Sequence, residues 1–143
     1  MKKNSCPIIE KIHARQILDS RGFPTIEVEV CASGIIGKAA VPSGASTGEF
    51  EALELRDLDK TRFHGKEVHT AVNNVINIFQ PQLINKKSDN QGEIDSLLME
   101  IDGTPNKSNY GANAMLGISM ACAVVSAKFY NQPLYLYLNK DSF

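Results

Sequence analysis

The segment 25–31 (TIEVEVC) constrains the fold most, because its residues alternate strictly between apolar and polar. A period of two residues is typical of a strand that buries one face and exposes the other. Ser33-Gly34 then favours a tight turn, and residues 35–41 resume a strand until Pro42, which has no N–H to donate. Together these residues predict a β-hairpin. The two faces of its first strand are Ile26, Val28 and Val30 against Thr25, Glu27 and Glu29.

A third strand is expected before the hairpin. Residues 8–18 alternate less cleanly, but they would extend the hairpin to an antiparallel meander of three strands. One face of such a sheet needs a covering layer. The chain that follows must therefore supply helices.

The first helical pattern covers residues 66–80, where apolar residues recur at helical spacing. Pro81 is expected to end this helix, because proline cannot continue the backbone ladder. In the second pattern, Ser88 and Gln91 have the spacing of a capping box. Gly103 stands at its far end, where a left-handed C-terminal cap belongs.

The third pattern, residues 112–131, is apolar on nearly all sides and ends before Pro133. It should be the central buried helix. The predicted fold class is α+β: a three-stranded antiparallel β-meander followed by a bundle of three or more α-helices. At 143 residues, the chain fits one domain, residues 1–143.

Composition excludes several classes of function. Hydrophobic residues make up 43% and charged residues 22%, which is typical of a folded globular protein. A net charge of -1 favours neither nucleic acid nor an anionic membrane as partner. The apolar run 115–127 is shorter than the roughly 20 residues of a membrane span. Three widely spaced cysteines and the lack of a signal sequence pattern predict a cytoplasmic protein.

The loop 42–48 (PSGASTG) is the most unusual stretch of the sequence. Its glycines allow left-handed backbone angles, and its hydroxyls and amides suit an oxyanion, a phosphate or a hard cation. A solvent-exposed connector is the alternative interpretation. A P-loop is excluded, because Glu49-Phe50 follows where Lys-Ser/Thr would be needed.

A run of mixed charge follows the loop, from Glu49 to Arg62. Its carboxylates suggest a metal site, but alternating charges are more typical of a solvated face of a short helix or turn. The three histidines, His13, His64 and His69, have no ligand spacing, which disfavours zinc. No serine has a G-x-S-x-G setting, so a hydrolase triad has no support. From the residues alone, the function stays open.

Four segments together resemble the amino-terminal domain of an enolase, in the right order. The resemblance covers nearly the whole chain, and known enolases continue into a large α/β barrel. Because the sequence stops at Phe143, we expect a fragment of a longer enzyme or the product of a truncated gene. The segments are 14–22 (ARQILDSRG), 24–28 (PTIEV), 42–57 (PSGASTG through ALELRD), and 103–108 (GTPNKS) with 111–114 (GANA).

The resemblance implies the reversible, Mg²⁺-dependent dehydration of 2-phosphoglycerate to phosphoenolpyruvate. In that family, the base lysine, the acid glutamate and the carboxylates of the first Mg²⁺ lie in the barrel. No catalytic residue is therefore expected in this chain, which should be inactive alone. Its expected contribution is a lid over the substrate, with Ser46 as a ligand of the second Mg²⁺. The lid residues are Ser43, Gly44, Ala45, Ser46 and Thr47.

The resemblance also implies a homodimer. Arg15 and Glu27 match positions that meet the barrel of the neighbouring subunit, although a surface ion pair within the sheet is the alternative. Two positions depart from the family pattern: Phe23 replaces a usual Asn, and Leu58 replaces a usual Gly. If that Gly has a positive φ, Leu58 costs roughly 1 kcal/mol in strain.

Two other functions remain open. The first is a noncatalytic interaction domain that kept the fold, with its barrel-facing surface exposed or covered by a partner. The second is a cap domain from another branch of the superfamily, acting on a different carboxylate. The sequence of residues 43–47 speaks against the second.

Overall fold

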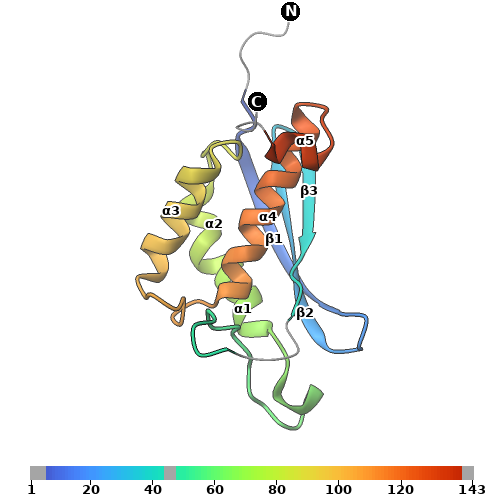
Figure 1. The fold of residues 1–143 in the computed structure, drawn as a ribbon, viewed down its shortest axis with the longest axis vertical. Helices are drawn as coiled ribbons and strands as arrows, with labels where there is room; N and C mark the ends of the chain where they lie inside the picture. The colour runs from blue at the N-terminus through green and yellow to red at the C-terminus, as the bar shows by residue number, and fades with distance from the viewer. Residues whose placement is uncertain (1–5, 44–47, 140–143) are drawn as a thin grey trace, which may run out of the picture.

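A computed structural model describes residues 6–43 and 48–139 of the chain. Three antiparallel strands form one sheet in the order β1-β2-β3 and are followed by helices, as predicted (Figure 1). The strands are β1 (Ile9–Leu18), β2 (Pro24–Ala32) and β3 (Ile35–Ala40). Ser33 and Gly34 join β2 to β3 with φ of 48° and 76°, which are the two positive angles of a type I′ hairpin turn.

The helices pack on one face of the sheet. In Figure 1, α4 lies across the strands and α3 lies beside it on the side away from the sheet. The helical segments are η1 (Phe63–Gly65), α1 (His69–Asn74), η2 (Val75–Phe79), α2 (Gln80–Leu83), α3 (Gln91–Asp102), α4 (Ala112–Phe129) and α5 (Leu134–Leu138). The alternation of β2 is confirmed, because Ile26, Val28 and Val30 are all fully buried.

Helix α4 is the central helix, as its composition predicts. By length and composition alone it is apolar enough to cross a membrane, but most of it is buried against the sheet and α3. Two glycines, one in β3 and one in α4, allow α4 to approach the sheet closely. A Cβ on Gly37 of β3 would lie 2.4 Å from the backbone nitrogen of Val125, and one on Gly117 would lie 2.5 Å from a methyl of Val28. Backbone therefore packs directly on backbone where β3 meets α4.

The prediction that Pro81 ends its helix is wrong. The helical path continues through α2 to Leu83, because η2 is a π-helical turn just before the proline. In this turn the Gln80 amide donates to the carbonyl of Val75, five residues earlier. The next carbonyl, that of Ile76, would need the N–H that Pro81 lacks, and the Gln80 side chain donates to it instead at 3.4 Å. The side chain thus replaces the missing donor.

The predicted capping box of α3 is also wrong. The helix begins at Gln91 after Asn90, with no side-chain cap hydrogen bond. Ser88 is fully buried, and its hydroxyl forms a hydrogen bond with the hydroxyl of Ser126 at 2.8 Å. The side-chain amide of Gln91 donates to the side chains of Asp95 and Ser119. Packing between α3 and α4 therefore outweighs the local capping pattern. Gly103 does end the helix with φ of 69°, as predicted.

Candidate functional site

The turn between β1 and β2 is the first part of the candidate site. The Asp19 carboxylate accepts the backbone N–H groups of Arg21 and Phe23 at 2.8 and 2.9 Å through one oxygen. The Asp19 amide donates to the carbonyl of Phe23, and Gly22 supplies a φ of 76°. The turn is thus closed by main-chain and side-chain hydrogen bonds together.

This turn contacts Ser43, the first residue of the predicted lid. Arg21 Nη2 donates to the Ser43 hydroxyl at 2.7 Å and to its carbonyl at 3.3 Å. The same hydroxyl donates to the second Asp19 oxygen at 3.1 Å. The other lid residues, Gly44, Ala45, Ser46 and Thr47, lie outside the described residues.

The electrostatics of the turn follow from these contacts. The backbone N–H of Phe23 is the largest cause that lowers the pKa of Asp19 to about 2, and Arg21 and Ser43 add to it. Asp19 is therefore a carboxylate at neutral pH. The Ser43 hydroxyl both accepts and donates within the protein, and it lies against a guanidinium. It is a poor ligand for a cation in this arrangement.

The backbone just before Ser43 is held by hydrogen bonds to β2. Thr25, which the alternation places on the polar face, is buried, and its hydroxyl donates to the carbonyl of Val41 at 2.6 Å. The Val41 amide donates to the carbonyl of Ile26 at 2.9 Å. Two further groups of β2 therefore fix the chain just before the loop.

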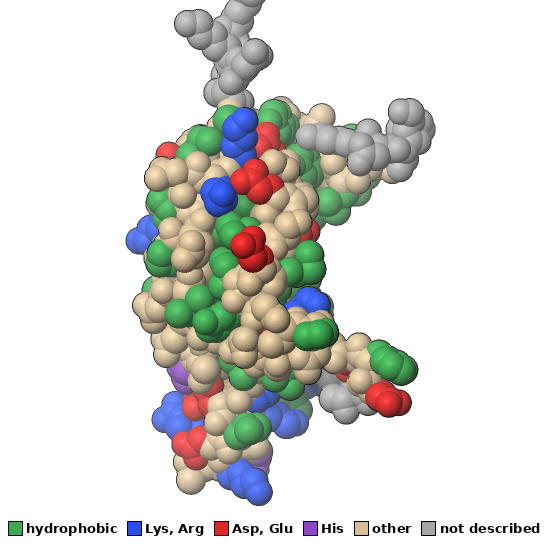
Figure 2. Space-filling model, turned by 90° about the vertical axis from the view of Figure 1, so that its left-hand side faces the viewer, with side chains coloured by type: hydrophobic (Ala, Val, Ile, Leu, Met, Phe, Trp, Pro, Cys, Tyr) green, Lys and Arg blue, Asp and Glu red, His purple; other side chains and the backbone are tan. Residues whose placement is uncertain are grey.

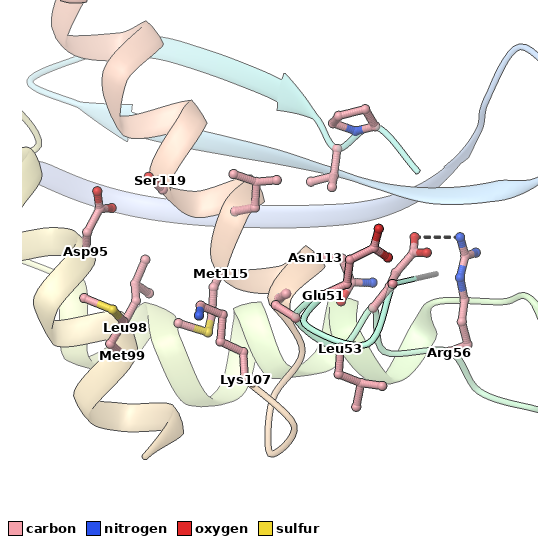
Figure 3. Close-up of a pocket in the computed structure, with 17 residues that line it drawn as sticks. Glu51, Leu53, Arg56, Asp95, Leu98, Met99, Lys107, Asn113, Met115 and Ser119 are labelled. Atoms are coloured by element: carbon pink, nitrogen blue, oxygen red, sulfur yellow. Dashed lines mark hydrogen bonds and ion pairs between the residues drawn. The ribbon is translucent and has the colours of Figure 1, made fainter. Parts of the chain in front are cut away.

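A groove of about 810 Å³ opens beside the loop, between α3, α4 and the segment 48–56 (Figure 3). Its walls are mainly apolar, and Leu53, Met99 and Leu116 are exposed there by 42%, 51% and 44%. Charged groups stand along its edge, including Glu51, Asp95 and Lys107. The space-filling view of the α3 side shows hydrophobic side chains among charged ones and a hollow in the outline of the molecule (Figure 2). Exposed apolar walls of this kind mark an interaction surface or a binding groove.

Asn113 holds one wall of this groove in place. Its side-chain oxygen accepts the Leu55 amide at 3.1 Å, and its side-chain nitrogen donates to the Leu55 carbonyl at 3.0 Å. Gly111, with φ of 93°, lies so close that a Cβ there would meet Leu55 at 2.6 Å. The segment 53–55 is therefore fixed to the start of α4. The sequence analysis includes Asn113 in the family segment 111–114, but nothing in the sequence predicts that its side chain binds the backbone of Leu55.

The sequence predicts that the charged residues from Glu49 to Arg62 form a solvated face, and this is only partly the case. Glu49 and Glu51 are exposed, but Arg56 donates to the Pro24 carbonyl at 2.6 Å and pairs with Glu54 at 2.6 Å. Asp57 accepts the first two amides of α1, those of His69 and Thr70. Burial works against its ionisation, but these hydrogen bonds outweigh burial and lower the pKa of Asp57. Arg56 and Asp57 thus have structural roles that sequence reasoning missed.

Arg15 and Glu27 lie side by side on β1 and β2. Arg15 bonds Glu27 at 2.9 Å and Glu29 at 3.1 Å, and Lys38 of β3 bonds Glu29 at 2.9 Å. The hydrogen bond from Lys38, and then that from Arg15, lower the pKa of Glu29. The ion pair within the sheet therefore exists in this chain, and a contact with a neighbouring subunit stays a prediction.

The two departures from the family pattern have different consequences. The Lys66 ammonium lies 3.6 Å from the centroid of the Phe23 ring. This cation–π contact joins the β1–β2 turn to the residue after η1. Leu58 has φ of 62°, so it occupies the left-handed region that favours glycine, and the condition for backbone strain is met. The amide of Leu58 donates to the Gly65 carbonyl at 3.0 Å, which holds that conformation.

The described residues hold no cluster of the side chains that most often bind metal ions. Within ranges 6–43 and 48–139, no group of three or more His, Cys, Asp or Glu side chains is arranged to hold a metal ion. The hydroxyl of Ser43 is engaged by Asp19 and Arg21, and Ser46 is not among the described residues.

Comparison with known proteins identifies the family of the chain. A family model described as "Enolase, N-terminal domain" matches residues 9–138. Enolases of Methanosarcina barkeri, Methanosarcina acetivorans and Methanosarcina mazei are each 59% identical over 129 or 130 residues, which is 90 to 91% of this chain. The chain spans about 30% of the length of these relatives. It therefore belongs to the enolase family and matches its N-terminal domain.

Proposed function

We propose that this chain works as the amino-terminal part of an enolase, the lyase of glycolysis that interconverts 2-phosphoglycerate and phosphoenolpyruvate. One observation carries the proposal: the family match covers residues 9–138, nearly all of the described chain. An apolar groove lined by Pro42 and Gly48, which the described residues leave open, supports it. We further propose a cytoplasmic location, because the three cysteines of the sequence are widely spaced and form no paired pattern.

The reaction removes a proton from a carbon next to a carboxylate, which creates negative charge that needs nearby cations. Active sites for this chemistry pair a Lys or His base with Mg²⁺, which stabilises that charge. The described residues do not fit this metal by themselves. In the proposal, the barrel supplies the base, the acid and the acidic ligands. This chain covers the site and excludes water.

The loop 43–47 is the part of the chain that we propose to cover the substrate. Ser46 would be a ligand of the second Mg²⁺, but only when the acidic ligands of the barrel are present. A lone hydroxyl offers one weak neutral oxygen, whereas hard cations take about six or more. The isolated chain should therefore bind Mg²⁺ negligibly.

The groove is the surface that we propose to face the barrel. Its exposed Met99 and Leu116 would be covered on assembly, since an apolar surface of this kind is costly in water. Pro42 and Gly48, which flank the loop, line the same groove. A barrel docked there would lie next to the lid. On the opposite, strand side, Arg15 and Glu27 would contact the second subunit of a homodimer.

The test is a fusion of this chain to the barrel of the Methanosarcina barkeri relative, with the chain alone and the barrel alone as controls. Formation of phosphoenolpyruvate is followed by absorbance at 240 nm, with and without Mg²⁺. We expect turnover by the fusion with Mg²⁺ and none by the chain alone. Turnover by the isolated chain, or a folded fusion without turnover, contradicts the proposal. The second result would favour a noncatalytic interaction domain.

A further inference from the structure

The turn formed by Asp19, Ser20, Arg21 and Gly22 has no role in the proposed reaction, yet it contacts the start of the lid. We propose that Asp19 and Arg21 are positioning residues that fix the direction of the chain at Ser43, three residues after the end of β3. The inference rests on the proposed function. It assigns Ser43 a supporting role, in contrast to a role as ligand of substrate or metal.

Both the side chain and the backbone of Ser43 are held by the turn. Arg21 Nη2 reaches the hydroxyl at 2.7 Å and the carbonyl at 3.3 Å, so one guanidinium fixes two atoms of the same residue. The Ser43 hydroxyl in turn donates a hydrogen bond to the Asp19 carboxylate at 3.1 Å. Rotation of this residue therefore breaks at least two charge-assisted hydrogen bonds.

The groups that hold Ser43 are themselves fixed. Asp19 accepts two backbone amides of its own turn, at 2.8 and 2.9 Å, and it pairs with Arg21 at 3.3 Å. Phe23, directly after the turn, makes a cation–π contact with the Lys66 ammonium, which holds this end of the turn. An exposed arginine has many rotamers, but this one has carboxylate and hydroxyl partners that select among them.

Strand β2 holds Val41 through Ile26 and Thr25, so the chain before Ser43 cannot shift freely. The turn adds the last constraint, at the residue where the loop begins. A lid that must place a group near reacting atoms gains rate from such a fixed starting point, since a displacement of about 1 Å costs roughly a hundredfold.

The experiment uses the active fusion of this chain with the barrel and three substitutions. Arg21→Met removes the guanidinium and keeps most of the side chain's length, and Ser43→Ala removes the hydroxyl. Ser43→Thr restores a hydroxyl at the same atom. Lys86→Met is the control, because Lys86 also pairs with a carboxylate, that of the exposed Glu93 at 3.1 Å, but contacts neither the turn nor Ser43.

We expect Arg21→Met and Ser43→Ala to lower kcat about tenfold or more and to raise the Mg²⁺ concentration needed for half-maximal rate. Ser43→Thr should recover most of the loss, and Lys86→Met should stay within about twofold of the parent. Far-ultraviolet circular dichroism must show that each variant is folded. If Arg21→Met and Ser43→Ala behave like Lys86→Met, the inference is wrong while the proposed function stands. An inactive parent fusion overturns the proposed function and this inference with it.

Discussion

Gly37→Ala should destabilise the chain strongly, although it adds a single methyl group. The new Cβ would lie 2.4 Å from the backbone nitrogen of Val125 and 2.7 Å from the carbonyl oxygen of Ala121. Ordinary contact begins at 3.4 Å, so β3 and α4 would have to separate by about 1 Å. Both neighbours are backbone atoms, and no rotamer change relieves the clash.

The expected loss of stability can be bounded from this geometry. Extra methyl groups in a packed core cost about 1–3 kcal/mol when side chains can adjust, and occasionally more. Here the helix must move as a unit, and Gly117 on the same helix would lose its contact with Val28. We therefore expect a loss of at least about 3 kcal/mol, from the roughly 5–15 kcal/mol that holds a typical domain folded.

Urea unfolding followed by far-ultraviolet circular dichroism measures the free energy of unfolding. Gly92→Ala is the matched control, because Gly92 lies in α3 with no atom within 4 Å of its added Cβ. That variant should gain up to about 1 kcal/mol from higher helix propensity. The same substitution should thus have opposite signs at the two positions. A cost below about 1 kcal/mol for Gly37→Ala would refute the close backbone packing of β3 on α4.

Two further predictions concern the turn and the strained leucine. Leu58→Gly should stabilise the chain by about 0.5–1 kcal/mol in the same urea assay, because relief of left-handed strain exceeds the entropy of a glycine in the unfolded chain. Leu58 is 76% exposed, so little burial is lost, and Leu58→Ala, which keeps the strain, should bring no such gain. Equal effects of the two substitutions would contradict this. The folded pKa of Asp19, about 2, is below its ordinary 3.8, so its stabilising contribution is present above that ordinary value and is lost as the pH falls through the folded pKa. The stability gap between the parent and Asp19→Asn should therefore shrink between about pH 5 and pH 2 in unfolding experiments, and a constant gap would show that the carboxylate is not the cause.

Much of the fold follows from local patterns in the sequence. The alternation of residues 25–31 predicts β2 and its buried face, and Ser33-Gly34 predicts the turn to β3. The apolar composition of residues 112–131 predicts the central helix, and Gly103 predicts the end of α3. These features depend on periodicity and on backbone angles that few residues adopt, and both can be read from neighbouring residues.

The candidate site is less predictable, because its contacts join residues far apart in the chain. The resemblance identifies the loop 43–47, but no local pattern links Arg21 to Ser43 or Asn113 to Leu55. The groove exists only where α3, α4 and the segment 48–56 meet. Its exposed Met99 and Leu116 look in sequence like ordinary helix positions.

The order of strands and helices and the family can be read from the sequence alone. The sequence gives strain at Leu58 only as a condition on the glycine of the family, and the structure supplies the positive φ. Tertiary packing was needed to reveal that Ser88 lies in the core instead of capping α3, and that the helix continues past Pro81. The same holds for the contacts of Ser43 with Asp19 and Arg21. The physical reason is that hydrogen-bonding side chains have several available partners, and packing between distant segments selects among them.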